Sequence, residues 1–316
     1  MTKLLKPIVA AIATATFAAP AAAADIVKLV VPFAAGGPVD QVTRTIAPAL
    51  ATELGKTVIV ENRGGAGGTV GANFVAKSPP DGATVLMATS GYVFSAGTTP
   101  SLPYDPKKDL EPVMLIGQVQ TLLVARPSLG VNTVQELIAK AKGGAALNYG
   151  STGVGSTMHV GGELFNMAAG TKVQHVPYKG AAPAITDLLG GQIDMLNADV
   201  PVLQPHVKDG RLKALVIYDT KRSPKLPDVP TATEAGLPEL MMSNYYTAMV
   251  PAGTPADVKK QLEQGLLKAV RSPQVAAKLS DAGLSEPMNM ADFESKLAGD
   301  FDRWIPFLQK AGIRAE

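Results

Sequence analysis

The sequence predicts an α/β fold made of two βα domains that are joined by two crossing segments of chain. Short apolar runs rich in Val, Ile and Leu alternate with longer segments in which apolar residues recur every three or four positions. This alternation is typical of parallel strands and helices that cover both faces of a sheet. It breaks off near residue 103 and restarts after residue 121, so we expect two such blocks.

Residues 1–24 have the pattern of a secretory signal peptide. Lys3 and Lys6 precede an apolar run that is too short to cross a bilayer, and Ala22-Ala23-Ala24 forms a small-residue cleavage signal. Cleavage after Ala24 leaves 292 of the 316 residues, and it lowers the formal charge from +2 to 0 because the signal carries two lysines and no acid. We therefore expect an exported protein of the bacterial periplasm.

The composition excludes several classes of partner. The chain has no cysteine, so it has neither disulfides nor a lipid-anchoring thiol. A neutral chain without a basic run has no electrostatic footprint for nucleic acid or a membrane surface. We expect a monomer that needs no cofactor.

The first block begins with a strand in Asp25–Phe33. Pro38 suits the first helical position, where its missing N–H costs nothing, and Gly55 commonly follows a helix, so Pro38–Leu54 is predicted to be helical. The further elements expected here are strands at Thr57–Val60 and Thr84–Ala88 and a helix that ends at Ala76.

A proline- and acid-rich connector, Pro103–Pro112, precedes the first crossing. Two β-like runs, Val113–Ile116 and Thr121–Ala125, are separated by Gly117-Gln118, where we place that crossing. The second block has predicted strands at Ala146–Tyr149, Val173–Val176, Ile193–Asn197 and Leu212–Tyr218, and predicted helices at Thr133–Ala141, Ser156–Ala168, Pro183–Leu189 and Val202–Lys208.

The chain then returns to the first block through the proline-rich Pro224–Pro230. A strand at Tyr245–Val250 and three terminal helices, Pro255–Val270, Ser272–Ala282 and Ala291–Ala311, complete it. We therefore expect residues 25–120 and 226–316 to form one lobe and residues 121–225 to form the other. Ligands of such sheets bind beyond the carboxyl ends of the strands.

Two loops that join a strand to a helix are the main candidates for binding. The first contains Phe33, Ala34, Gly36 and Gly37, and the second contains Ser151, Thr152, Gly155 and Ser156. Loops of this kind present backbone N–H groups and hydroxyls at the positive end of a helix dipole, where an anion is stabilised. We predict that the two loops face each other and close on a small carboxylate.

Seven short motifs stand in one order along the chain. They are VVPFxxGGxxD from Val30, VENRxGAGG from Val60, PYDP from Pro103, YGSTGxGS from Tyr149, HVPYKG from His175, PDVPT from Pro227 and PAGTP from Pro251. Each is weak alone, but the ordered set resembles the Bug family, the extracytoplasmic solute receptors of tripartite tricarboxylate transporters. The resemblance covers essentially all of the mature chain.

This resemblance implies a two-lobed periplasmic binding-protein fold of type II. It also implies capture of a small carboxylate or related organic acid and its delivery to membrane permease subunits. In the family, the loops matched here by Phe33–Gly37 and Ser151–Ser156 hold the ligand through backbone amides, hydroxyls and bridging waters. Where many members carry a tryptophan before the PAGTP strand, this chain has Asn244-Tyr245-Tyr246.

Several candidates have a structural alternative. The hydroxyls and glycines of the second loop equally fit a helix cap and a tight turn. His159 either donates to a carboxylate or caps that loop, and Asp199 either accepts from an amino or hydroxyl group of the ligand or caps the next helix. Asp40 is expected to be structural, because its carboxylate complements the dipole of the helix it begins and would repel an anion.

Other candidates follow predicted strand ends. They are Ser90, Gly91 and Tyr92 in the first block, and Tyr178 and Lys179 in the second. Lys179 either pairs with an acid or is solvated.

Enzymatic, nucleotide and metal sites are not expected. The chain lacks G-x-S-x-G and H-E-x-x-H motifs, and Val70 stands where a dinucleotide-binding loop needs glycine. His175 and His206 have no partner at the spacing of metal ligands. Two other hypotheses stay open at this point: a secreted hydrolase that uses cleft carboxylates, and a solute sensor that docks on a membrane kinase.

Overall fold

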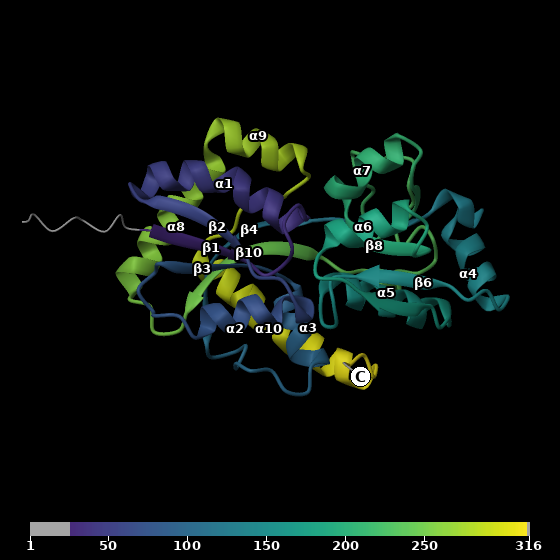
Figure 1. Ribbon diagram of the computed structural model, residues 1–316, viewed down its shortest axis with the longest axis horizontal. Coiled ribbons are helices and arrows are strands. Elements are labelled where there is room, and N and C mark those ends of the chain that lie inside the picture. The colour runs from purple at the N-terminus through teal and green to yellow at the C-terminus, as the bar shows by residue number, and fades with distance from the viewer. Residues whose placement is uncertain (1–25, 315–316) are drawn as a thin grey trace, which may run out of the picture.

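Two five-stranded sheets organise this computed structural model, which describes residues 26–314 (Figure 1). The strand order is β2-β1-β3-β10-β4 in one sheet and β7-β6-β8-β5-β9 in the other. We call each sheet with its covering helices the first lobe and the second lobe, respectively. The expected signal peptide and its cleavage site lie outside the described residues.

The first lobe takes its strands from both ends of the described chain. Helices α1, α8 and α9 lie over one face of its sheet, and α2, α3 and α10 lie over the other (Figure 1). The elements are β1 (Ile26–Val31), α1 (Pro38–Leu54), β2 (Thr57–Asn62), η1 (Ala66–Gly68), α2 (Thr69–Ala76), β3 (Thr84–Thr89), α3 (Gly91–Thr98), β4 (Leu110–Val119), β10 (Asn244–Pro251), α8 (Ala256–Arg271), α9 (Pro273–Asp281) and α10 (Met290–Lys310).

The second lobe is built from the middle of the chain. Helices α4 and α5 lie on one side of its sheet, and α6 and α7 lie on the other (Figure 1). The elements are β5 (Thr121–Ala125), η2 (Pro127–Leu129), α4 (Val134–Lys142), β6 (Asn148–Ser151), α5 (Thr157–Ala169), β7 (Gln174–Pro177), α6 (Ala181–Leu189), β8 (Met195–Asp199), α7 (Val200–Lys208) and β9 (Lys213–Ile217), followed by η3 (Pro238–Leu240).

The parallel strand pairs predicted in each block are present, as β2-β1-β3 and β7-β6-β8, but one strand in each sheet runs against its neighbours. β10 is antiparallel to β3 and β4, and β5 is antiparallel to β8 and β9. These are the strands that the chain enters directly after crossing from the other lobe. Parallel neighbours need a covering crossover such as a helix, and a strand that arrives from the other lobe has none.

The first crossing also lies later than predicted. Gly117 and Gln118 belong to β4, where they pair with Tyr246 and Tyr245 of β10. The chain passes between the lobes at Gln120, which is the one residue between β4 and β5. The position requires a glycine because Ser285 packs closely on it: a Cβ at position 117 would lie 2.8 Å from the Ser285 carbonyl oxygen.

The two crossing segments are tied together. The Gln120 side chain donates hydrogen bonds to Asp219 Oδ2 (3.0 Å) and to the Lys221 carbonyl (2.8 Å). On the return path, the Ile217 N–H donates to the Pro230 carbonyl (2.8 Å), so the chain runs beside β9 before it crosses back at β10. The lobes are therefore joined by neighbouring strands of backbone, an arrangement that permits hinge motion.

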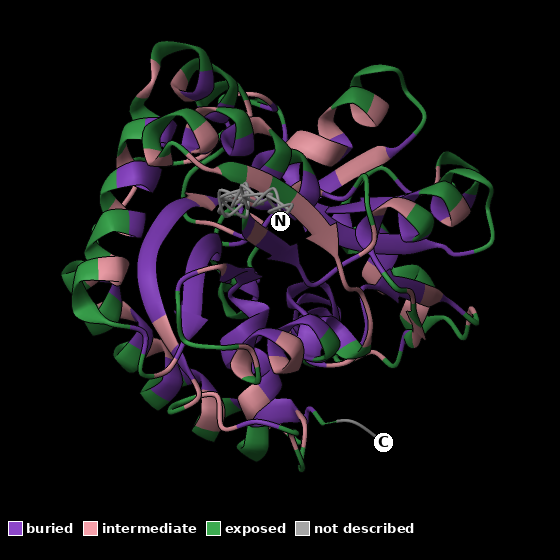
Figure 2. Ribbon diagram, turned by 60° about the vertical axis from the view of Figure 1, so that its left-hand side comes forward, coloured by how far each residue is buried: buried purple, intermediate pink, exposed green. Residues whose placement is uncertain are grey.

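Apolar packing accounts for the layers. Most strands are buried, although the edge strands β2 and β7 are partly exposed, and most helices combine buried and exposed residues (Figure 2). One apolar cluster continues through both lobes and includes Phe94 and Trp304 in the first and Tyr149 and Phe165 in the second. Within residues 26–314, no helix combines the length and the apolarity that a membrane crossing requires.

Candidate ligand-binding site

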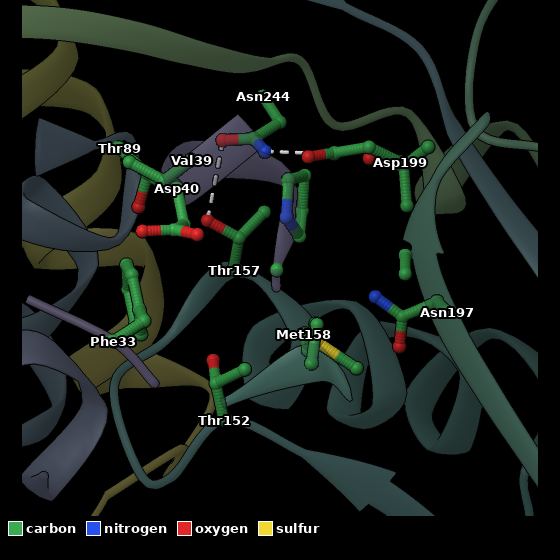
Figure 3. Close-up of a pocket in the computed structure, with 15 residues that line it drawn as sticks. Phe33, Val39, Asp40, Thr89, Thr152, Thr157, Met158, Asn197, Asp199 and Asn244 are labelled. Carbon is green, nitrogen blue, oxygen red and sulfur yellow. Dashed lines mark hydrogen bonds between the residues drawn. The ribbon is translucent and has the colours of Figure 1, made fainter. Parts of the chain in front are cut away.

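A pocket lies between the two sheets, and both lobes contribute to its wall (Figure 3). Its volume is about 40 Å³, which is room for a few water molecules. The first lobe supplies the loop after β1, the start of α1, the last residue of β3 and the first residue of β10. The second lobe supplies β5, β8, the loop after β6 and the starts of α5 and α6. The lining residues are Phe33, Gly37, Pro38, Val39, Asp40, Thr89, Thr121, Thr152, Thr157, Met158, Ala181, Asn197, Ala198, Asp199 and Asn244.

Three helices begin at this pocket. Pro38 of α1, Thr157 of α5 and Ala181 of α6 all lie in first turns that line it. No side chain caps α1 or α6, so no capping group occupies their first N–H groups. Because a helix N-terminus carries a partial positive charge, three of them at one pocket favour an anion.

The first predicted loop divides into lining and shaping residues. The Phe33 ring and Gly37 line the pocket. The Ala34 N–H donates to the carbonyl of Lys179 (3.0 Å), which joins the two lobes instead of facing the pocket. Gly36 has φ +84°, and its N–H donates to Asp40 Oδ2 (2.9 Å).

Asp40 holds this loop in place. Its carboxylate accepts hydrogen bonds from Gly36 N–H, from Asn62 Nδ2 (2.9 Å) and from Arg44 Nε (3.0 Å). Burial raises the pKa of Asp40, but these donors outweigh burial and leave its pKa below the usual value. Asp40 is thus a paired carboxylate, in agreement with the structural role expected for it.

In the second predicted loop, neighbouring hydroxyls point in different directions. Thr152 lines the pocket (Figure 3). The fully buried Ser151 hydroxyl turns into the second lobe, where it accepts from Gly153 N–H (3.0 Å) and hydrogen-bonds His175 Nε2 (2.5 Å). Ser151 therefore supports the backbone on which Thr152 sits.

Ser156, Gly155 and His159 form the cap of α5. Ser156 Oγ accepts from the His159 N–H (3.2 Å), and His159 Nδ1 accepts from the Gly155 N–H (3.3 Å). Burial, with a smaller contribution from neighbouring His175, lowers the pKa of His159 to about 3. His159 is neutral and does not line the pocket, so it offers no positive charge to a ligand.

A hydrogen-bond network joins the lobes beside the pocket. The Asn244 amide donates to Asp199 Oδ1 (2.8 Å), and its carbonyl oxygen accepts from Thr157 Oγ1 (3.4 Å) (Figure 3). The same carbonyl oxygen accepts from Ser90 Oγ (2.9 Å). The Tyr246 hydroxyl donates to the other Asp199 oxygen. Burial raises the pKa of Asp199 to about 6, although both donors act in the opposite direction.

The other predicted residues lie outside the pocket wall. The Tyr92 hydroxyl donates to the Pro106 carbonyl (2.6 Å), and Gly91 N–H donates to Thr89 Oγ1 (3.1 Å). The Tyr178 hydroxyl donates to Asp187 Oδ2 (2.8 Å). Lys179 has an exposed side chain, and its carbonyl takes part in the contact with Ala34 described above.

Comparison with known proteins identifies the chain. Residues 42–313 match the model of the tripartite tricarboxylate transporter family receptor. BugT of Bordetella pertussis is 34% identical over 322 residues, which cover 99% of each chain. The chain belongs to this receptor family.

Solved structures of such receptors have the same fold. The periplasmic binding protein BugD matches with a TM-score of 0.88 and 32% identity over 92% of this chain and 99% of that one. MatC of Rhodopseudomonas palustris, solved with bound malate, matches with a TM-score of 0.86 and 32% identity over 89% and 98% of the two chains. A second protein of that organism, solved with adipate, also gives 0.86, with 33% identity over 92% and 98%. The predicted Bug-family membership and two-lobed periplasmic binding-protein fold are confirmed.

Sequence reasoning missed several side chains of this receptor's pocket wall. Thr121, Asn197 and Asn244 line the pocket but were not predicted. Asn197 stands two residues before Asp199 on β8, and side chains two apart on a strand share a face. That spacing was the available signal. Among the described residues, no three His, Cys, Asp or Glu side chains are grouped so that they could hold a metal ion.

Proposed function

We propose that this receptor captures a small carboxylate in the pocket between its lobes. The observation that carries the proposal is the meeting of the α1, α5 and α6 N-termini at one pocket to which both lobes contribute. Their N–H groups supply donors for a carboxylate without a buried cation. The malate and adipate bound by the two related receptors support the same ligand class.

The affinity expected from such contacts is sufficient for solute capture. A hydrogen bond to a charged group contributes about 1.5–3 kcal/mol. About three or four of them support micromolar binding after the cost of immobilising the ligand and closing the lobes. The residues that we propose to contact the ligand are Phe33, Gly37, Thr152 and Asp199, and Ala34, Gly36, Ser151, Gly155 and Ser156 shape the loops around it.

We propose a receptor without catalytic activity. The two carboxylates of the pocket wall, Asp40 and Asp199, are each engaged by at least two donors, so neither is free to act as an acid or a base. This argument weighs against the hydrolase hypothesis.

Family membership supports a role in transport. We propose that the chain works as a monomer in the periplasm, after cleavage at Ala24, and delivers its ligand to the permease subunits of a tripartite tricarboxylate transporter. Each sheet with its covering helices would then move as one lobe around the crossing segments at Gln120 and before β10.

Thermal shift against a panel of mono-, di- and tricarboxylates, followed by calorimetry, tests this function. Because the ligand binds only the native state, a ligand at 100 times its Kd should add about 2.7 kcal/mol of stability. Sugars and inorganic phosphate serve as controls. A response to these controls and to none of the acids would refute carboxylate capture.

A further inference from the structure

Two side chains of the pocket wall have polar atoms without partners. Both amide atoms of Asn197 and the hydroxyl of Thr121 are buried with no hydrogen-bond partner among the described residues. Asn197 is 0% exposed and Thr121 is 1% exposed. Buried polar groups are nearly always paired, because an unpaired one forfeits the hydrogen bonds that it makes to water. Since both side chains line the pocket, a ligand can supply the missing partners.

The register of the second sheet groups these side chains with Asp199. Thr121 of β5 lies opposite Asp199 of β8, and Leu123 lies opposite Asn197. Side chains that are two apart or directly opposite share a face of a sheet, so Thr121, Asn197 and Asp199 point to the same side.

That side faces α5 and the pocket. Gly161 of α5 leaves space for the Asn197 amide, since a Cβ there would lie 2.3 Å from Asn197 Nδ2. The amide nitrogen points toward the middle of the pocket (Figure 3).

The chemistry of this group selects what it can bind. An amide and a hydroxyl can each donate and accept, whereas a carboxylate only accepts. A ligand hydroxyl or amino group can donate to Asp199 or to Asn197 Oδ1. Asn197 Nδ2 can in turn donate to the oxygen of a ligand hydroxyl. A second ligand carboxylate has no proton to donate and would be repelled by Asp199.

We propose that the ligand is a carboxylate that also carries a hydroxyl or amino group, and that Asn197 and Thr121, beside Asp199, recognise this second group. The proposal rests on carboxylate capture and narrows the ligand class. The ligand carboxylate faces the N-termini of α1, α5 and α6, and the ligand hydroxyl or amino group faces β5 and β8.

Calorimetry with matched acids tests this specificity. The titrants form two series. In the first, propionate is the parent acid of lactate and alanine, and in the second, succinate is the parent acid of malate and aspartate. Within at least one series, the hydroxy or amino acid should bind at least about tenfold more tightly than its unsubstituted parent. The lactate, malate, alanine and aspartate arms distinguish a hydroxyl ligand from an amino ligand.

Two near-isosteric variants locate the specificity. Asn197→Leu and Thr121→Val remove the unpaired polar atoms and nearly preserve volume, so the protein should remain folded and no less stable. Each should bring the affinity for the substituted acid closer to the affinity for its unsubstituted parent. Asn73→Leu is the matched control, because Asn73 also has an unpaired buried oxygen but does not line the pocket. It should leave the preference unchanged.

The outcomes separate the two proposals. Equal binding of parent and substituted acids, or full discrimination in both pocket variants, overturns this inference and leaves carboxylate capture intact. Failure of every acid to bind overturns both. If Asn197→Leu does not fold, Thr121→Val still decides.

Discussion

At the scale of single residues, burial makes histidine neutral next to the second loop. His159 is 5% exposed and lies 4.6 Å, ring centre to ring centre, from His175, and burial lowers the pKa of His175 to about 4. The Gly155 N–H needs His159 Nδ1 as an acceptor, which the neutral ring provides. Neutral histidines therefore support the loop that carries Thr152.

This arrangement predicts acid sensitivity. In the unfolded chain His159 titrates near its ordinary value of about 6.5, whereas in the folded protein its pKa is lowered to about 3. Below pH 6.5 the unfolded state binds more protons, so the free energy of unfolding falls as pH falls, by about 1.4 kcal/mol per pH unit for this group. His159→Asn keeps an acceptor near the position of Nδ1 but does not titrate. In urea denaturation between pH 6 and pH 4, the unfolding free energy of this variant should fall less steeply with decreasing pH than that of the parent protein, by about that amount per pH unit.

Titration of Asp199 does not affect the difference between the parent protein and the His159→Asn variant. The raised pKa of Asp199 stabilises the fold as pH falls from about 6 to about 4, which is the opposite sense, and it is present in both proteins. His206→Asn, which changes a histidine with a smaller buried fraction, is the control. Equal slopes for His159→Asn and the parent protein would contradict the assignment.

The sequence predicted two loops that contribute to the pocket wall, but not the direction of their side chains. Ser151, Thr152 and Ser156 have the same kind of hydroxyl in one loop, yet Thr152 lines the pocket while the two serines hold backbone. That choice depends on what packs behind the loop, here His175 and His159. Asn197 was missed although its two-residue spacing from Asp199 places both side chains on one face of β8, because that spacing does not say whether the face lines a pocket.

At the scale of elements, strong terminal signals were reliable. The helix predicted at Pro38–Leu54 is α1, residue for residue, because Pro38 fixes its start and Gly55 ends it at φ +63°. Helix α3 was not predicted. Its sequence, GYVFSAGT, contains two glycines and ends in threonine, so propensity is low, and burial of nearly every residue between α10 and the first sheet stabilises it instead.

Asp40 joins α1 to the loop before it, so a mutation of Asp40 should lower stability and weaken carboxylate binding. Asp40→Asn keeps the shape but removes the charge that Arg44, Gly36 and Asn62 satisfy, and its amide nitrogen would oppose one of these donors. We expect about 1–3 kcal/mol lower stability in urea denaturation and weaker carboxylate binding, since Gly37 and Phe33 lose their support. Asp257→Asn, an exposed first-turn acid of α8, should change stability by a few tenths of a kcal/mol at most. Similar losses in the two variants would argue against a special role for Asp40.

At the scale of the whole molecule, glycines let the lobes meet closely. A Cβ at Gly67 would lie 2.0 Å from the Val154 carbonyl oxygen, and one at Gly155 would lie 2.8 Å from Thr98 Oγ1. These contacts join residues from different lobes. Two blocks of strands and helices could be predicted from periodicity, but which surfaces meet across the gap is a tertiary property that no local pattern encodes.

Lobe closure can be tested at Gly180, which lies opposite Ala34 of the first lobe. Gly180 has φ 179°, a backbone that any residue adopts, so Gly180→Ala adds no backbone strain. Its Cβ would lie 2.7 Å from Ala34 Cβ and 2.9 Å from Ala34 N, so it would push the lobes apart and weaken the hydrogen bond from Ala34 N–H to the Lys179 carbonyl. If binding requires closure, affinity for the carboxylate should fall at least about tenfold, or 1.4 kcal/mol.

The unliganded protein should keep its Tm within a few degrees, because each core is untouched, and small-angle scattering should find less compaction on ligand addition. Gly299→Ala, on α10 with nothing within 4 Å of the new methyl group, should bind like the parent. Parent-like affinity and compaction in Gly180→Ala would mean that the ligand is held without this contact, and the closing role of the Gly180–Ala34 surface would have to be abandoned.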